Sequence, residues 1–122
     1  MKITLFTSNQ SRHNYLVNSL EKVCNELFVI QEKKTGSKSS VTSHKAQSKV
    51  KNIYFNKVVR AEKKVFGDYK LNKKIKILKI KGNINDYSLK NFKDYLKSDL
   101  FIVYGSTYIK GKLLNILKSK KA

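Results

Sequence analysis

The stretch "MKITLFTSNQSRHNYLVNSLEKVCNELFVIQ" (residues 1–31) decides the fold class. The apolar run at 2–6 predicts a short strand, and a polar loop follows it. The next segment carries apolar residues at helical spacing: Leu16, Leu20, Val23 and Cys24. The continuous apolar centre of 26–31 predicts a second strand, of the kind found in parallel sheets covered on both faces. Strand, loop, helix and strand within about 30 residues form one βαβ unit.

The remainder of the chain continues the alternation of helices and strands. The spacing predicts a helix from about 41 to 66, ended by Gly67, and then a strand at 75–80, a helix at 85–98, a strand at 100–104 and a helix after Ile109. Lysines alternate with apolar residues at 75–80, which predicts a strand at a sheet edge with one face near water. We therefore expect an α/β fold, an open, mainly parallel, Rossmann-like sheet with helices on both faces.

The strand predicted at 100–104 is the most apolar of the chain, which suits the centre of a sheet. The pattern predicts no further strand before Ala122. Because an apolar strand left at an edge is an aggregation hazard, we expect strands to follow Ala122. We interpret the sheet as truncated after the fourth strand.

The composition excludes several classes of protein. The 122 residues suffice for one domain at most, and 40% hydrophobic residues are enough to form a core. Cys24 is the single cysteine, so an internal disulfide and a cysteine-rich zinc site are both excluded. The opening "MKITLF" is too short and too soon followed by polar residues to be a signal peptide, and no apolar run approaches the roughly 20 residues of a membrane helix. We expect a cytoplasmic protein with no membrane partner.

The formal net charge of +19 is the strongest compositional signal. It comes from 25 lysines and only two arginines, whereas sites that read bases or grip phosphates favour arginine. The lysines are spread over the whole chain together with eleven asparagines, which is typical of AT-rich codon usage. A basic α/β module that binds RNA or DNA remains an alternative. An α/β domain that completes its sheet by dimerisation is another.

Two loops follow strands and so lie at the end of a parallel sheet where ligands bind. The first, "FTSNQSRH" (6–13), offers hydroxyl, amide, guanidinium and imidazole groups at the start of a helix, where anions bind. Its alternative is a plain turn in which Ser8, Asn9 or Ser11 caps the helix and Arg12 and His13 are solvated. The second loop is "VYGSTYIKG" (103–111), and its alternative interpretation is a glycine turn with two exposed tyrosines.

Both loops carry a family resemblance. The segment "MKITLFTSNQSRHNYLVNSL" (1–20) resembles the opening of the formyltransferase family, especially members similar to methionyl-tRNA formyltransferase and the sugar N-formyltransferases. The segment "DLFIVYGSTYIKGKLLNILKSKKA" (99–122) resembles a later part of the same family, with a buried strand, a Tyr-Gly loop and a Leu-rich helix. The resemblance covers both ends of the chain and determines the middle, 32–80, only loosely.

The resemblance implies transfer of a formyl group from 10-formyltetrahydrofolate to an amine. The acceptor would be a small-molecule amine, including phosphorylated or nucleotide-linked amines, or an aminoacyl-tRNA. By the resemblance the first loop lies on the amine side, with substrate-binding residues Ser8, Asn9, Gln10, Arg12 and His13. The second loop would hold the folate, largely through backbone groups, at Tyr104, Gly105, Ser106, Tyr108 and Ile109.

The chain departs from the family in one respect that matters for catalysis. The family's catalytic Asn-x-His lies on the strand directly after the Leu-rich helix, and its catalytic Asp comes later still. The sequence ends at "LKSKKA", before that strand. We therefore interpret residues 1–122 as the N-terminal portion of a single, incomplete formyltransferase domain, whose missing C-terminal portion is its natural partner. We assign no catalytic residue or metal ligand, and we expect the chain alone to be inactive.

Overall fold

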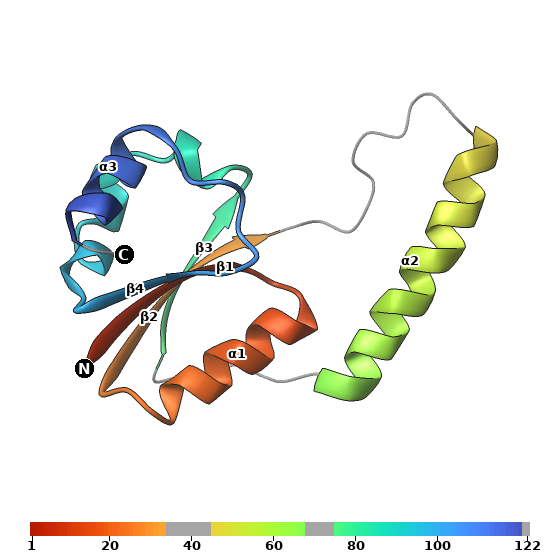
Figure 1. The fold of residues 1–122 in the computed structure, drawn as a ribbon, viewed down its shortest axis with the longest axis horizontal. Helices are drawn as coiled ribbons and strands as arrows, with labels where there is room; N and C mark the ends of the chain where they lie inside the picture. The colour runs from red at the N-terminus through yellow and green to blue at the C-terminus, as the bar shows by residue number, and fades with distance from the viewer. Residues whose placement is uncertain (34–44, 68–74, 121–122) are drawn as a thin grey trace.

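The computed structural model describes residues 1–33, 45–67 and 75–120 (Figure 1). Within these residues four parallel strands form one open sheet in the order β3-β2-β1-β4. The strands are β1 (Lys2–Ser8), β2 (Glu26–Lys33), β3 (Lys76–Lys81) and β4 (Leu100–Val103). The expected parallel α/β fold is confirmed, and β3 lies at a sheet edge as its alternating pattern predicted.

The α-helices of the described residues are α1 (Ser11–Glu21), α2 (Lys45–Phe66) and α3 (Gly111–Ser119). The prediction of one helix at 85–98 is wrong. The chain forms three short 3₁₀ helices there, η1 (Ile84–Asp86), η2 (Leu89–Phe92) and η3 (Tyr95–Lys97). The backbone is extended at Tyr87 and Ser88, and the Ser88 side chain accepts a hydrogen bond from the amide of Lys90, which starts a new turn. Capping by polar side chains therefore outweighs the helical spacing of the apolar residues.

The sheet separates two apolar clusters, because successive residues of a strand point to opposite faces. Ile3 and Leu5 of β1 lie on one face with Val17 of α1, whereas Phe6 lies on the other. The Phe6 face is covered by the 3₁₀ helices and by α3, which contributes Leu117. Helices thus cover both faces, as expected, with α1 on one side and α3 on the other (Figure 1).

The apolar face predicted for the first helix is partly wrong. Val17 and His13 are the fully buried residues of α1, while Leu16 and Leu20 pack at the margin of the core. Val23 is 71% exposed. The reason is that α1 ends at Glu21, so Val23 lies in the turn before β2 and leaves the helical face.

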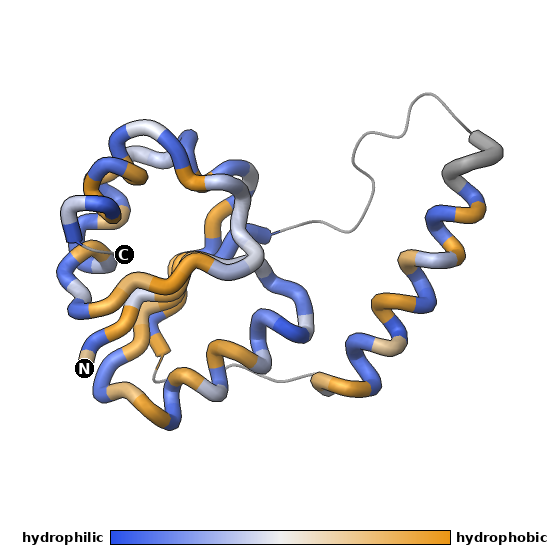
Figure 2. The backbone as a smooth tube through the Cα atoms, in the orientation of Figure 1, coloured by the Kyte–Doolittle hydropathy of each residue, from blue (hydrophilic) through white to orange (hydrophobic). Residues whose placement is uncertain are grey.

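Helix α2 extends away from the sheet and meets the body of the molecule through α1, where the rings of Tyr15 and Phe66 lie 5.5 Å apart (Figure 1). Gly67 ends α2 as predicted, with φ at 73° and its amide bonded to the carbonyl of Lys63. Hydrophobic residues recur along α2 (Figure 2), and seven of its large apolar side chains are exposed. Five of the seven lie at helical spacing, and we call them the α2 stripe: Val50, Ile53, Tyr54, Val58 and Val65.

Strand β4 lies at the second edge of the sheet. Within the described residues it pairs with β1 alone, and Leu100 and Val103 are exposed by 37% and 49%. The central positions belong to β1 and β2, whose side chains are buried almost throughout. No strand of the described residues therefore pairs with the second side of the most apolar run of the sequence.

Candidate functional site

The carboxyl ends of β1 and β4 place the two candidate loops side by side. The strands pair with Phe6 opposite Val103, and the amide of Tyr104 donates to the carbonyl of Phe6 across 2.9 Å. The first loop leaves β1 within two residues of that point and enters α1. The second loop begins at Tyr104 itself. Parallel pairing thus brings together residues 97 positions apart in the chain.

His13 is the centre of this junction. Its side chain is 1% exposed, and its Nδ1 lies 2.6 Å from the hydroxyl of Ser8, which is itself buried. The imidazole meets the ring of Tyr104 edge to face, with centroids 5.3 Å apart and planes at 71°. The alternative that leaves His13 solvated is therefore wrong. His13 joins the end of β1 to the loop after β4.

Gly105 completes the contact from the other side. A Cβ built on Gly105 would lie 2.1 Å from Nε2 of His13, closer than any side chain tolerates. Its φ of 74° lies in the left-handed region that glycine adopts without strain. The glycine predicted to bind folate thus has a structural role that the sequence does not reveal, since it admits the imidazole.

The remaining first-loop residues start the helix. Gln10 is the N-cap of α1, and its carbonyl accepts from the amides of His13 and Asn14. The alternative in which Ser8, Asn9 or Ser11 is the cap is therefore wrong. Asn9 lies in the short connection between the end of β1 at Ser8 and the start of α1 at Ser11.

Arg12 forms an ion pair within the chain. Its Nη1 lies 3.2 Å from Oε2 of Glu62 on α2, and its amide donates to Oε1 of the same carboxylate across 3.0 Å. The Arg12 side chain remains 41% exposed, whereas that of Glu62 is 11% exposed. An anionic ligand at Arg12 would therefore compete with the Glu62 carboxylate for the guanidinium, or would share the guanidinium with it.

The second loop presents a more open surface. Tyr104 is 45% exposed and Tyr108 is 93% exposed, so both predicted folate contacts are accessible. Ser106 donates through its hydroxyl to the carbonyl of Thr107. Ile109 packs against the core on the α3 side and anchors the end of the loop.

A shallow cavity of about 390 Å³ joins residues of the two loops. Arg12 lines it from α1 and Tyr104 from the second loop, so we call it the Arg12–Tyr104 cavity. Its other lining residues are apolar or aromatic: Tyr15, Leu16, Phe66, Ile102 and Val103. The volume lies within the range of small-molecule sites. One guanidinium and one phenol over an apolar wall could orient a small polar molecule.

Glu32 is a residue of this region that the sequence analysis missed. It stands at the carboxyl end of β2 and is 2% exposed. Its carboxylate accepts from the amide and the hydroxyl of Thr107, the latter across 2.8 Å, and from the amide of Ile84 across 3.2 Å. A buried carboxylate with three donors fixes the second loop and the start of η1 to β2. The one signal in the sequence is an acidic residue two positions after the apolar run of β2.

Gln31 fixes the end of β1 and the start of α1 to β2 by hydrogen bonds. It is 3% exposed, and its amide nitrogen donates to the carbonyl of Ser8 and to the side-chain oxygen of Asn14. The last residues of β2 therefore hold the end of β1, the start of α1 and the loop after β4. The carboxyl edge of the sheet is a hydrogen-bonded platform.

Other kinds of site are not found in the described part of the chain. Its residues contain no group of three or more His, Cys, Asp or Glu side chains placed to hold a metal ion. None of its helices combines the length and the apolarity needed to cross a membrane. Burial raises the pKa of the Cys24 thiol, which lies near the opposite end of the sheet.

A scan against protein-family models and searches of curated proteins and of solved structures found no match to this chain.

Proposed function

We propose that this chain forms the substrate-binding portion of a folate-dependent formyltransferase. The observation that supports the proposal is the contact of His13 with Tyr104 and Gly105. It joins the two segments, 1–20 and 99–122, that separately resemble that family. The contact lies at the edge of the parallel sheet where ligands bind.

The proposed reaction begins when the amine nitrogen attacks the formyl carbon of 10-formyltetrahydrofolate. The carbonyl oxygen gains negative charge in the tetrahedral intermediate, and the bond from carbon to N10 then breaks. The proton that the amine loses ends on N10 of the departing tetrahydrofolate. Donors that stabilise such an oxyanion supply much of the rate, and the family places them on an Asn-x-His that these 122 residues do not contain.

The residues present would therefore bind and orient. Arg12, the one first-loop residue that lines the Arg12–Tyr104 cavity, would meet the amine substrate there, and Tyr104 lines the folate side. Gly105, Ser106, Tyr108 and Ile109 continue the folate side along the second loop. We expect this chain to bind 10-formyltetrahydrofolate without transferring its formyl group.

Titration calorimetry of the chain with 10-formyltetrahydrofolate tests the proposal. The Tyr108→Ala variant should weaken binding by about three- to tenfold, because it removes one accessible aromatic contact. Tyr54→Ala is the matched control, since Tyr54 is an exposed tyrosine of α2 away from the loops. Both variants should melt at the temperature of the parent chain.

The same titration separates folate binding from the nucleic-acid alternative. Binding of folate should change little between low and moderate salt. Absence of folate binding, together with RNA binding that falls steeply as salt rises, would refute the proposal and favour a basic nucleic-acid module.

A further inference from the structure

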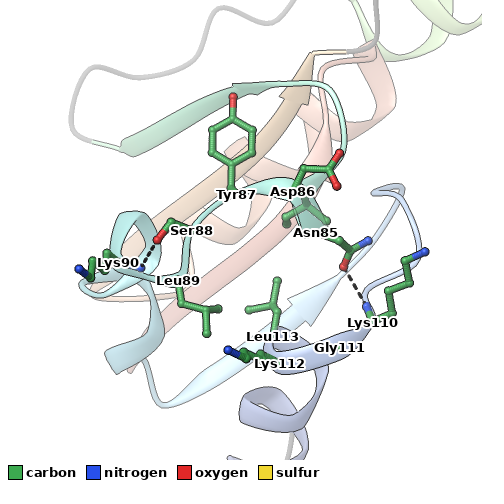
Figure 3. A pocket seen from close by; sticks show the side chains of 11 residues that line it. Asn85, Asp86, Tyr87, Ser88, Leu89, Lys90, Lys110, Gly111, Lys112 and Leu113 are labelled. Carbon is green, nitrogen blue, oxygen red and sulfur yellow. Dashed lines mark hydrogen bonds between the residues drawn. The ribbon is translucent and has the colours of Figure 1, made fainter.

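A second cavity, of about 680 Å³, opens on the far side of the loop after β4 (Figure 3). One wall is the segment from Ile84 to Lys90, and the other is the start of α3 from Lys110 to Leu113. Its volume is typical of sites for small molecules. We call it the Leu89–Leu113 cavity, after two side chains that face each other across its centre in Figure 3.

Hydrogen bonds hold the two walls at a fixed separation. The Asn85 side chain donates to the carbonyl of Tyr108 across 2.8 Å and accepts from the amide of Lys110 across 2.9 Å. Glu32 adds a second tie, because it accepts from the amide of Ile84 in one wall and from Thr107 beside the other. The cavity is therefore formed before any ligand arrives, which lowers the entropic cost of binding.

The inner lining is apolar and ordered. Ile84 is fully buried and Leu113 is 4% exposed, while Leu89 packs at the margin of the same core. Tyr87 contributes a ring whose hydroxyl is bound to the backbone of Lys81 and is thereby fixed in place. An aliphatic or aromatic group would bury apolar surface against this lining.

The rim carries positive charge. Three ammonium groups, of Lys90, Lys110 and Lys112, stand against the single carboxylate of Asp86. Lys90 and Lys110 lie at opposite sides of the cavity in Figure 3. The ion pairs within the described residues involve other lysines, Lys2 and Lys97, and the side chains of these three rim lysines are exposed to solvent. Arg12, by contrast, already has a carboxylate partner.

We infer that the Leu89–Leu113 cavity binds a small ligand with an apolar, preferably aromatic, body and at least two negative charges. The body lies against the leucines and Tyr87, and the anionic groups meet the ammonium groups of the rim. Carboxylates and phosphate share this chemistry. The inference stands apart from the proposed function, because the cavity shares with the Arg12–Tyr104 cavity only the loop between them.

Backbone amide NMR shifts of the isotope-labelled chain locate such binding directly. The two probes are isophthalate, an aromatic dicarboxylate that is no part of a folate, and 1-naphthyl phosphate. The neutral p-aminobenzamide is the control ligand. Saturable shifts at 84–90 and 110–113 with at least one charged probe, and none with the neutral ligand, are expected. The tighter of the two probes identifies the anionic group.

Two triple variants separate this site from the general charge of the molecule. K90Q/K110Q/K112Q removes the rim charge and should weaken the tighter probe by about tenfold. K49Q/K51Q/K57Q removes the same charge from exposed positions of α2 and should bind as the parent does. All six side chains are exposed, so both proteins should fold.

Three results would overturn the inference. One is equal weakening by the two triple variants, which would indicate attraction to net charge alone. Another is a pattern of shifts scattered over lysines of the whole chain or centred on residues 8–13. The third is the absence of saturable shifts with either charged probe.

Discussion

The Nε2 atom of His13 lies 2.1 Å from the position that a Cβ would take on residue 105, so glycine fits there and a residue with a side chain would clash. The imidazole is buried, and Ser8 and Tyr104 contact it from two further directions. The approach of α1 to the loop after β4 therefore depends on the absence of one carbon atom. The same contact holds the two candidate loops against each other.

Gly105→Ala should destabilise the chain by about 2–4 kcal/mol, because the methyl group overlaps the imidazole and because the φ of 74° is strained for alanine. Urea unfolding followed by circular dichroism measures the loss. Gly82→Ala is the matched control, since Gly82 also has a positive φ but nothing within 4 Å of its Cβ. The control should lose only about 1–2 kcal/mol. Equal losses in the two variants would show that the His13 contact is not tight.

Glu32→Gln should cost about 2–3 kcal/mol of unfolding free energy. The amide offers one acceptor oxygen in place of two and turns a donor toward the donors of Thr107 and Ile84. Hydrogen exchange of the Thr107 and Ile84 amides should accelerate in the variant. Glu26→Gln, at the exposed start of the same strand, should leave both stability and exchange unchanged. Protected Thr107 and Ile84 amides in Glu32→Gln would contradict the role given to this carboxylate.

The Arg12–Glu62 pair links α1 to α2, and a double-mutant cycle with Arg12→Gln and Glu62→Gln should give a coupling of about 0.5–1 kcal/mol. The value stays small because the arginine is 41% exposed and solvent screens the pair. The Lys97–Asp94 pair, whose side chains are 63% and 82% exposed, should give a coupling near zero. A larger coupling at Lys97–Asp94 than at Arg12–Glu62 would rule out this interpretation.

Alkylation of Cys24 by iodoacetamide should reach its half-maximal rate at a higher pH in the folded chain than in urea. Burial raises the pKa of the thiol, and the ammonium group at Met1 offsets this only in part. Because the folded state favours the neutral thiol, Cys24 contributes its full share to the free energy of unfolding below the ordinary thiol pKa. This contribution is lost as the pH rises through the pKa of the thiol in the folded chain. Coincident pH profiles of the folded and unfolded chains would disprove the shift.

Much of the fold follows from local pattern. The apolar runs that became β1 and β2 stand out in the sequence because each is short, continuous and bounded by polar residues. The alternation in β3 identified an edge strand, since one of its faces had to carry lysines. The side-by-side position of the two candidate loops also followed, because parallel strands present their carboxyl ends to one edge.

What escaped prediction depends on contacts between distant segments. His13 looks like a solvated residue of a polar loop until β4 brings Gly105 against it. Glu32 resembles an ordinary loop residue, and only the donors of Thr107 and Ile84 make its burial favourable. The first two 3₁₀ helices begin at the capping side chains of Asn83 and Ser88, which compete locally with a helical apolar pattern. Apolar spacing alone carries none of this information.

The α2 stripe places aliphatic and aromatic side chains in water on a helix about 33 Å long. At low ionic strength the charge of +19 keeps molecules apart, and the long-range repulsion hides the short-range attraction between stripes. Near physiological salt the repulsion reaches only about 8 Å, which is less than the thickness of a helix. The osmotic second virial coefficient of the solution should therefore change sign from positive to negative as salt is added. The salt concentration of the buffer therefore determines whether molecules of this chain repel or attract one another.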